Sequence, residues 1–212
     1  MPKFQLTLLA ALILIGPSCG GGGKSVPAPL LQETFSGTFP GTNWSAVSPP
    51  GATPNVGIVN GMLEFSASAA TGAATTTTLT TFGIPNVSFS VQMAATAAAG
   101  LKGTGTIEII DGTPTVIASV TWNPETSSIA YAILGTSSAG ISPVPNSNGA
   151  LNHFVFSIDS AGKGTWSLNN VAQVNNATAI TATPLRIKLG ATFGTGTSWP
   201  VFDFDNVTVT NP

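Results

Sequence analysis

The stretch "NVSFSVQM", residues 86–93, decides the class of fold. Its apolar side chains occupy every second position, at Val87, Phe89, Val91 and Met93. Successive side chains of a β-strand point to opposite faces of a sheet, so a period of two predicts a strand with one buried and one solvent-facing side. An amphipathic helix would need apolar residues spaced three and four apart. We therefore expect a strand here.

The same alternation recurs along most of the chain after Glu33. It is found in "GMLEFSA" (61–67), "TVIASVTW" (115–122), the row Ile129, Tyr131 and Ile133, "LNHFVFSID" (151–159), "PLRIKLG" (184–190) and "VFDFDNVTVT" (201–210). In the last run, unbroken alternation places Asp205 on the same face as Val207 and Val209. No stretch shows a helical stripe.

Turn signals separate these runs. Asp111-Gly112 and Asn169-Asn170 suit tight hairpins, because Asp, Asn and Gly tolerate a positive φ. Residues 137–149 are rich in Ser, Gly, Pro and Asn and are expected to form a loop. About eleven short strands at hairpin spacing predict an all-β fold, an antiparallel two-sheet β-sandwich.

The composition limits the possible functions. Only 7% of residues are charged, whereas soluble domains average about 25%. The few Lys and Arg residues are scattered, so the chain lacks the basic stripe of a nucleic-acid-binding protein, and no nucleic-acid partner is expected. A single cysteine excludes a disulfide within the chain.

The amino-terminal segment has the pattern of an export signal. Lys3 precedes an apolar run, residues 4–15, which is too short for a membrane-spanning helix of about 20 residues and suits a secretory signal. Ser18-Cys19 resembles the end of a bacterial lipoprotein signal, although Gly16 and Pro17 depart from the usual pattern. The resemblance implies cleavage before Cys19 and lipidation of its thiol; ordinary cleavage after Ser18 is the alternative.

The residues after Cys19 support an anchored protein. Four glycines and then "KSVPAP", residues 24–29, form a tether that is flexible first and stiffer afterwards. The sequence thus predicts three parts: a signal peptide (1–18), a lipidated cysteine with a tether (19–32) and one domain (33–212). In lipoproteins of this type, Gly20 rather than aspartate after the cysteine implies anchoring to the bacterial outer membrane or cell surface.

Three stretches resemble bacterial concanavalin A-like lectin/glucanase domains of the LamG-like type. They are "ETFSGTFPGTNW" (33–44), "IVNGMLEFS" (58–66) and "FDFDNVTV" (202–209), joined by the hairpin "KGTWSLNNVAQV" (163–174). The resemblance spans most of residues 33–210 and implies a jelly-roll sandwich. The family includes sugar-binding, hydrolytic and adhesive domains, so the fold does not choose among them.

The sequence does not predict an enzyme. The hydrolases of this family carry Glu-x-Asp-x-x-Glu on one strand, whereas Glu108 and Asp111 are three residues apart and would face opposite sides of a strand. The chain contains no Gly-x-Ser-x-Gly motif whose serine the only histidine, His153, would activate as a general base. A surface or half-buried structural role is expected for it.

A structural calcium ion is the one cofactor that the resemblance implies. In the family such an ion joins an acid of the first strand to an aspartate of the last. Glu33 and Asp205 occupy the matching positions, with Asp203 nearby. Carboxylates are suitable calcium ligands, and an ion would neutralise their repulsion; solvated acids at the strand ends are the alternative.

Aromatic residues are the candidates for glycan binding, because sugar rings stack on exposed aromatic side chains framed by polar groups. Trp199, in the loop "GTGTSWP", is expected to be the most exposed. Trp122 and Tyr131 are further candidates, although each shares a strand face with apolar residues and can belong to the core. The sequence thus favours a non-catalytic cell-surface lipoprotein module that binds carbohydrate. The alternatives are a structural or adhesive protein without a specific ligand and, disfavoured, a glycoside hydrolase-like domain.

Overall fold

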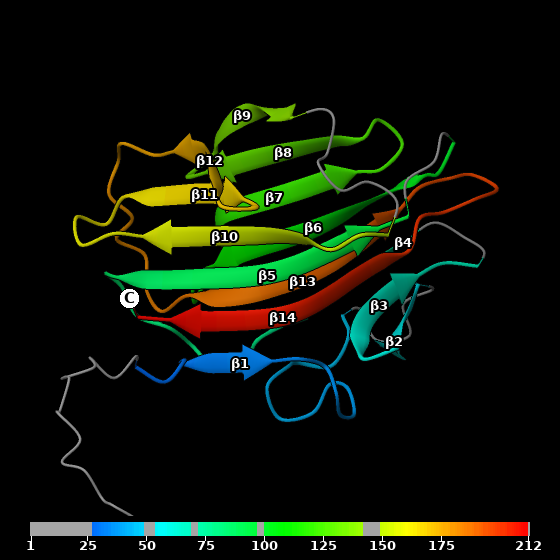
Figure 1. Ribbon diagram of the computed structural model, residues 1–212, viewed down its shortest axis with the longest axis horizontal. Coiled ribbons are helices and arrows are strands. Elements are labelled where there is room, and N and C mark those ends of the chain that lie inside the picture. The colour runs from blue at the N-terminus through cyan, green and yellow to red at the C-terminus, as the bar shows by residue number, and fades with distance from the viewer. Residues whose placement is uncertain (1–26, 49–53, 69–71, 97–99, 142–148, 212) are drawn as a thin grey trace, which may run out of the picture.

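A computed structural model describes residues 27–48, 54–68, 72–96, 100–141 and 149–211 (Figure 1). Within these ranges the chain forms fourteen β-strands and no helix, in two antiparallel sheets packed as a sandwich. The predicted all-β two-sheet class is confirmed. No helix in the described part of the chain is long and apolar enough to cross a membrane.

The larger sheet has eight strands. In spatial order they are β12 (Val171–Asn175), β11 (Gly164–Leu168), β10 (Asn152–Ile158), β5 (Val87–Ala95), β14 (Phe202–Thr210), β3 (Met62–Ser66) and β2 (Asn55–Val59), with β1 (Leu31–Glu33) also paired to β14. One edge of β14 pairs with β5 along most of its length. Its other edge pairs first with β3 and then with β1.

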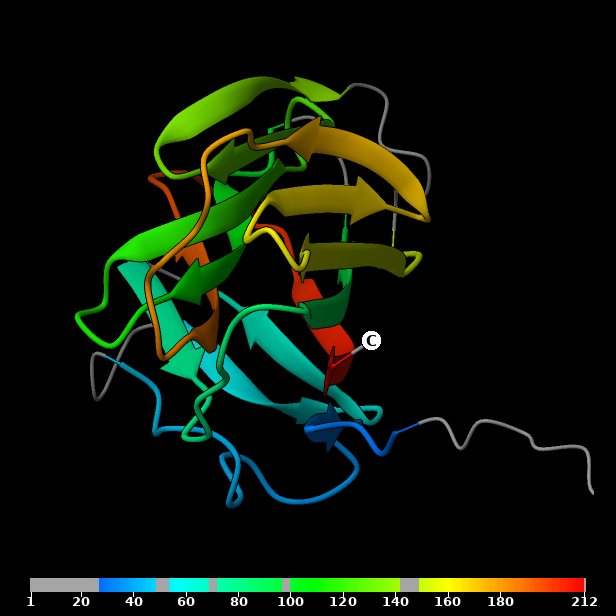
Figure 2. The ribbon, with the colours of Figure 1, turned by 90° about the vertical axis from the view of Figure 1, so that its left-hand side faces the viewer.

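The smaller sheet has six strands. In spatial order they are β4 (Gly72–Thr77), β13 (Arg186–Phe193), β6 (Gly103–Ile110), β7 (Val116–Asn123), β8 (Ser128–Ile133) and β9 (Thr136–Ile141). Figure 2 shows the two layers from the side. Strand β9 covers the first five residues of the segment expected to be a loop, so that expectation was wrong for residues 137–141.

The core lies between the sheets and is rich in aromatic side chains. The inward residues of β5, from Val87 to Met93, are at most 1% exposed, which confirms the alternation predicted for "NVSFSVQM". Aromatic pairs join the two layers: Tyr131 with Trp166, Trp122 with Phe154, and Phe193 with Phe202, at ring-centroid distances of 6.4, 6.5 and 6.1 Å. Contacts at these distances add to the stabilisation from burial alone.

A β-bulge in β14 reverses part of the predicted alternation. The register between β14 and β5 shifts between Asp205 and Thr208, and Asn206 has a φ of 48°. Asp205 follows the alternation set by the buried Phe202 and Phe204 and lies on the outer face, and the extra residue returns Val207 to the buried face. The prediction that Asp205 and Val207 share a face was therefore wrong, because strict alternation does not allow for a bulge.

The predicted tether includes residues that belong to the domain. The signal peptide, Cys19 and the tether as far as residue 26 lie outside the described residues. Leu31 begins β1 and is 6% exposed, and the Leu30 amide donates to the Val209 carbonyl at 2.7 Å. The folded domain thus begins before the expected boundary at Glu33.

Two hairpin predictions had different outcomes. Asn169 and Asn170 form a two-residue turn between β11 and β12, both with a positive φ, as predicted. Asp111-Gly112 belongs to a longer connection, in which the Asp111 carboxylate accepts hydrogen bonds from the amides of Thr113 and Thr115. Hydrogen bonding, first from the Thr113 hydroxyl, lowers the pKa of Asp111.

We expect Gly105→Ala to destabilise the protein by about 1–3 kcal/mol, the usual range for overpacking a core. A Cβ at Gly105 would lie 2.5 Å from Cδ1 of Phe202, a residue of the opposite sheet. Gly57→Ala is the matched control, since a Cβ there meets no atom within 4 Å. Urea unfolding of both variants measures the effect, and equal unfolding free energies would contradict the packing argument.

Candidate functional site

The outer face of the six-stranded sheet carries rows of polar side chains. Because partners in an antiparallel register share a face, Thr192 and Thr104 lie side by side, as do Lys188 and Glu108. The apolar residues between them on β6, such as Ile107, point into the core. This face is therefore covered by hydroxyl and charged groups.

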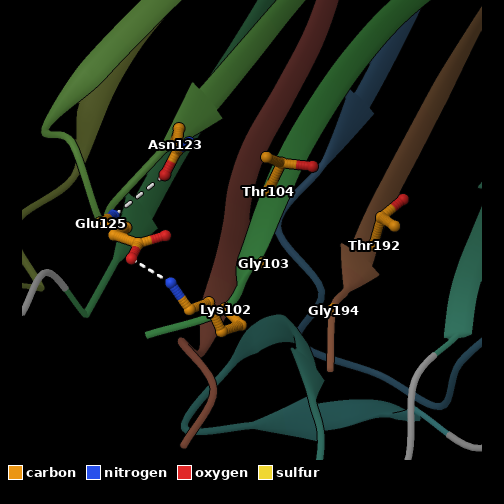
Figure 3. Close-up of a pocket in the computed structure, with 7 residues that line it drawn as sticks. All are labelled: Lys102, Gly103, Thr104, Asn123, Glu125, Thr192 and Gly194. Atoms are coloured by element: carbon orange, nitrogen blue, oxygen red, sulfur yellow. Dashed lines mark hydrogen bonds and ion pairs between the residues drawn. The ribbon is translucent and has the colours of Figure 1, made fainter. Parts of the chain in front are cut away.

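A pocket of about 230 Å³ opens at one end of this face (Figure 3). It lies where β7 and β13 end and β6 begins, since neighbouring strands run in opposite directions. Its lining residues are Lys102, Gly103, Thr104, Asn123, Glu125, Thr192 and Gly194. Antiparallel pairing thus gathers residues from three separate parts of the sequence.

An ion pair between Lys102 and Glu125 crosses the pocket (Figure 3). Their side chains are 42% and 34% exposed, so both are open to a ligand. The Glu125 amide donates to Oδ1 of Asn123 at 3.0 Å, which orients this side chain. Among the described residues, Nδ2 of Asn123 has no partner. The pocket therefore offers ammonium, amide, hydroxyl and carboxylate groups, a set that suits a ligand rich in hydroxyls.

The loop that contains Trp199 holds Lys102 in place. The Lys102 amide donates to the Ser198 carbonyl, and the Gly194 amide donates to the Lys102 carbonyl, each at 3.1 Å. Nε1 of Trp199 donates to the Gly194 carbonyl at 2.8 Å. A Cβ at Gly196 would lie 2.8 Å from Cγ of Lys102, so the loop backbone packs against the lysine stem.

The aromatic residues predicted to stack on sugars are not exposed platforms. Trp122 is 0% and Tyr131 1% exposed, so neither can contact a ligand on the surface, and burial raises the pKa of Tyr131. The sequence places them on apolar strand faces, and the opposite sheet covers those faces. Trp199 is the least buried tryptophan but is only partly exposed and packs against the core, so it supports the pocket rather than forming its surface.

The residues predicted to bind calcium are not brought together. Glu33 pairs with the buried Val207 and therefore faces inward, whereas Asp203 and Asp205 alternate with buried phenylalanines and face outward. Both carboxylate oxygens of Glu33 accept hydrogen bonds, from the Phe35 amide and from Nδ2 of Asn43, each at 2.9 Å. The described residues include no group of three His, Cys, Asp or Glu that could hold a metal. These residues do not fit a shared calcium ion.

A pair of carboxylates that the sequence did not suggest lies on the outer face of the eight-stranded sheet. Asp203 of β14 pairs directly with Glu64 of β3, and Cβ atoms in such pairs are typically about 4.5–5.5 Å apart. Burial, and secondarily the charge of Glu64, raises the pKa of Asp203 to about 6. The pairing of β3 with β14 joins segments far apart in the sequence, which is why alternation alone could not find it.

The only histidine, His153, lies on the same face. Its Nε2 is 2.6 Å from Oγ of Ser90 on the neighbouring strand β5, and its backbone amide donates to Oδ1 of Asn169. His153 is half-buried. The predicted surface or half-buried position of the histidine agrees with this geometry.

The two glutamates on the six-stranded face are each paired with a lysine. Oε2 of Glu108 lies 2.8 Å from Nζ of Lys188, and Glu125 pairs with Lys102. Asp111 lies in the loop after β6 and is bound by its own loop residues. Glu108 and Asp111 thus do not form an acid pair, as their spacing predicts.

Comparisons with known proteins identify the fold. No family model matches the chain, and no curated protein matches it in sequence. Solved structures similar to it include a β-glucanase of Bacillus licheniformis (TM-score 0.62, 14% identity, 86% of this chain and 97% of that one). The Emp47p carbohydrate recognition domain is also similar (TM-score 0.61, 10% identity, 85% and 93%).

A sialidase gives a TM-score of 0.64 at 12% identity over 85% of this chain, which spans only 18% of the sialidase chain. At such identities the likeness shows the fold alone. That fold is the jelly roll shared by concanavalin A-like lectins, galectin-like domains and glucanases. Both hydrolases and a carbohydrate recognition domain are among these neighbours.

We expect Asp203→Asn to raise the melting temperature at pH 8 and to change it little at pH 4.5. The folded-state pKa of about 6 lies above the ordinary aspartate value of 3.8, so ionised Asp203 destabilises the fold, and the stability contributed by this group rises as pH falls from about 7 to about 4. The variant removes this dependence. Thermal unfolding across the window tests it, with Asn substituted for the solvated Asp159 as control; an unchanged pH profile would contradict the assignment.

Proposed function

We propose that this chain is a non-catalytic carbohydrate-binding module, with its site at the pocket of Lys102, Thr104, Asn123, Glu125 and Thr192. The observation that carries the proposal is the convergence of these polar groups on one pocket of the six-stranded face. Sugar hydroxyls both donate and accept hydrogen bonds, and this set supplies both functions. The carbohydrate recognition domain and glucanase among the structural neighbours support it.

The size of the pocket suits one sugar ring. About 230 Å³ lies below the roughly 300–1,000 Å³ typical of sites for drug-sized ligands. Each hydrogen bond contributes about 0.5–1.5 kcal/mol net. Four such bonds give roughly 4 kcal/mol, so hydrogen bonds alone support a Kd no tighter than about 1 mM, because association also costs translational and rotational freedom. We therefore infer weak binding to single sugars and tighter binding to multivalent surfaces.

A hydrolytic role is disfavoured by the arrangement of the acids. Sugar hydrolysis usually needs two carboxyl groups on either side of one bond. At the pocket, Glu125 is paired with Lys102, and Glu108 is paired with Lys188. Glu64 and Asp203 adjoin one another, but they lie on the other sheet and do not line this pocket. We therefore propose binding without catalysis.

The expected result for Asn123→Ala is at least a fivefold loss of affinity for whichever glycan the wild type binds on an array. The change removes an amide donor from the pocket and the acceptor of the Glu125 backbone amide. Trp199→Ala should also weaken binding, because the loop holding Lys102 loses its indole hydrogen bond. Thr208→Ala, on the outer face of the other sheet, is the control and should bind normally.

Three results would contradict this proposal. Glycan binding that survives both Asn123→Ala and Trp199→Ala would place the site elsewhere. Release of reducing sugar from a glycan, lost in Glu64→Gln, would favour a hydrolase. A protein that binds no member of a broad array would favour the structural or adhesive alternative.

We further propose that the domain is exported and anchored by a lipid on Cys19 to the bacterial outer membrane or cell surface. The support is the sequence of the leader and of the Gly/Pro tether. A weakly binding domain held at high density on a membrane gains avidity, so anchoring and a millimolar site are compatible.

Full-length protein expressed in a bacterial host should appear in the membrane fraction and incorporate labelled palmitate. Cys19→Ala should abolish the labelling and move the protein out of the washed membrane fraction, because a stable anchor requires the acyl chains. Ser18→Ala, which keeps a small residue before the cysteine, is the control. Equal labelling of the Cys19→Ala protein would show that the thiol is not the lipidated group.

A further inference from the structure

The charge of the pocket comes from two side chains. Among the described residues that line it, only Lys102 and Glu125 are charged, and the other five are Gly, Thr or Asn. The second ion pair of this face, Lys188 with Glu108, lies four residues farther along β13 and β6 than the pocket threonines. At roughly 3.3 Å per residue this is about 13 Å, which exceeds the Debye length of about 8 Å at physiological ionic strength. Lys102 and Glu125 therefore decide how the pocket responds to a charged ligand.

The ammonium group of Lys102 is occupied by Glu125. Nζ of Lys102 donates to Oε1 of Glu125, and it points toward Glu125 and away from Thr192 (Figure 3). The lysine side chain is 42% exposed, so a ligand can reach it. An ammonium group forms strong charge-assisted hydrogen bonds with anions such as carboxylate and sulfate. Without Glu125, sugars that carry an acidic group would therefore be the expected ligands of this pocket.

Glu125 is held beside Lys102 by the turn between β7 and β8. The Glu125 amide donates to Oδ1 of Asn123 at 3.0 Å, and the Ser127 amide donates to the Pro124 carbonyl at 3.4 Å. The ring of Pro124 also fixes the backbone φ of the residue before Glu125. Because the main chain is already ordered, the ion pair costs only the freedom of the two side chains.

Two effects of Glu125 oppose the binding of an anion. The anion has to displace Oε1 of Glu125 from Lys102, and the displaced carboxylate then lies close to a ligand of the same charge. Like charges brought together in a binding site lower the affinity for the wrong partner. A neutral sugar meets neither effect, because it binds through hydrogen bonds to groups such as Asn123 and Thr104.

We propose that Glu125 is the specificity-determining residue of the pocket: by occupying Lys102 it makes the pocket accept uncharged sugars and exclude sugars that carry a carboxylate or a sulfate, such as uronic acids. This inference rests on the proposed function, in which the pocket binds sugars. It assigns the substrate class to one side chain. Lys102 alone favours an acidic sugar, and Lys102 paired with Glu125 favours a neutral one.

Matched pairs of ligands test this assignment. Methyl glucoside and methyl glucuronide share a ring and carry a hydroxymethyl group and a carboxylate, respectively, on the same carbon; methyl galactoside and methyl galacturonide form a second pair. The backbone amide resonances of Gly103, Thr104 and Gly194, which line the pocket, report binding there in a ¹⁵N–¹H titration. The readout is the affinity for the acidic member of a pair divided by the affinity for the neutral member, because a general change in the pocket affects both.

The wild type should bind the neutral member of each pair more tightly. Glu125→Gln keeps the shape of the side chain and removes its charge, so it should raise the ratio about fivefold, the upper end of what an exposed ion pair contributes. The gain should disappear in about 0.5 M salt, which screens exposed charges. Glu108→Gln, the same change in a lysine-paired glutamate outside the pocket, is the matched control and should leave the ratio unchanged. The double variant Lys102→Gln/Glu125→Gln should lose the gain, which locates the bound acid at Lys102.

An unchanged ratio in Glu125→Gln would overturn the inference, as would a wild-type protein that prefers the acidic member of each pair. The proposed function fails separately, if no neutral sugar shifts the pocket resonances of the wild type. In that case the acidic sugars alone decide. Their binding to Glu125→Gln but not to the wild type would support the role of Glu125, and binding to neither protein, or equally to both, would overturn it.

Discussion

The contacts between aromatic side chains of the two sheets are the interaction on which the rest of the molecule depends. Trp166 lies at one of them: its ring packs against Phe156 of its own sheet and Tyr131 of the other, and its Nε1 donates to the Ala132 carbonyl of the opposite sheet at 3.3 Å. The chain has no disulfide to reinforce it, since it has a single cysteine. Fully burying a large apolar side chain contributes about 1.5–3 kcal/mol, so a few such contacts match the whole net stability of a typical domain. Stability therefore comes from the inner faces of the two sheets, and the outer faces can carry polar groups.

The strand order fixes how the loop after β1 lies against this aromatic core. β14 is central in the larger sheet, and its bulge at Asn206 marks the point where pairing on one edge passes from β3 to β1. The bulge keeps Val207 in the core although Asp205, two residues earlier, lies on the outer face. Because β1 is held beside Val207, Glu33 is positioned to tie the loop of residues 34–44 against the core. A single extra residue in the last strand thus helps to position β1 and the loop that follows it.

The sequence predicted what depends on local alternation and failed where distant segments meet. The inward rows of β5 and β10 followed from their period of two, and the Asn169-Asn170 turn followed from the tolerance of asparagine for positive φ. The same alternation put Trp122 and Tyr131 on apolar faces, but only the second sheet shows that these faces are covered. The pairing of Glu64 with Asp203 and that of Lys102 with Glu125 depend on which strands become neighbours. No local pattern encodes that order, so the residues of the pocket had no signal in the sequence.

The distribution of charge separates the two outer faces. On the six-stranded face, each carboxylate is neutralised by a lysine, as in the pairs Glu108 with Lys188 and Glu125 with Lys102. The strands of the eight-stranded sheet contain no Lys or Arg, so no cation offsets the raised pKa of Asp203, which burial and secondarily the charge of Glu64 cause. Directed hydrogen bonds contribute to the binding free energy of a neutral glycan. A net electrostatic field contributes little to it, because the hydroxyls of the glycan carry no charge. Local neutralisation leaves the pocket end of the six-stranded face with donors and acceptors but little net charge, which is the electrostatic environment that such a ligand requires.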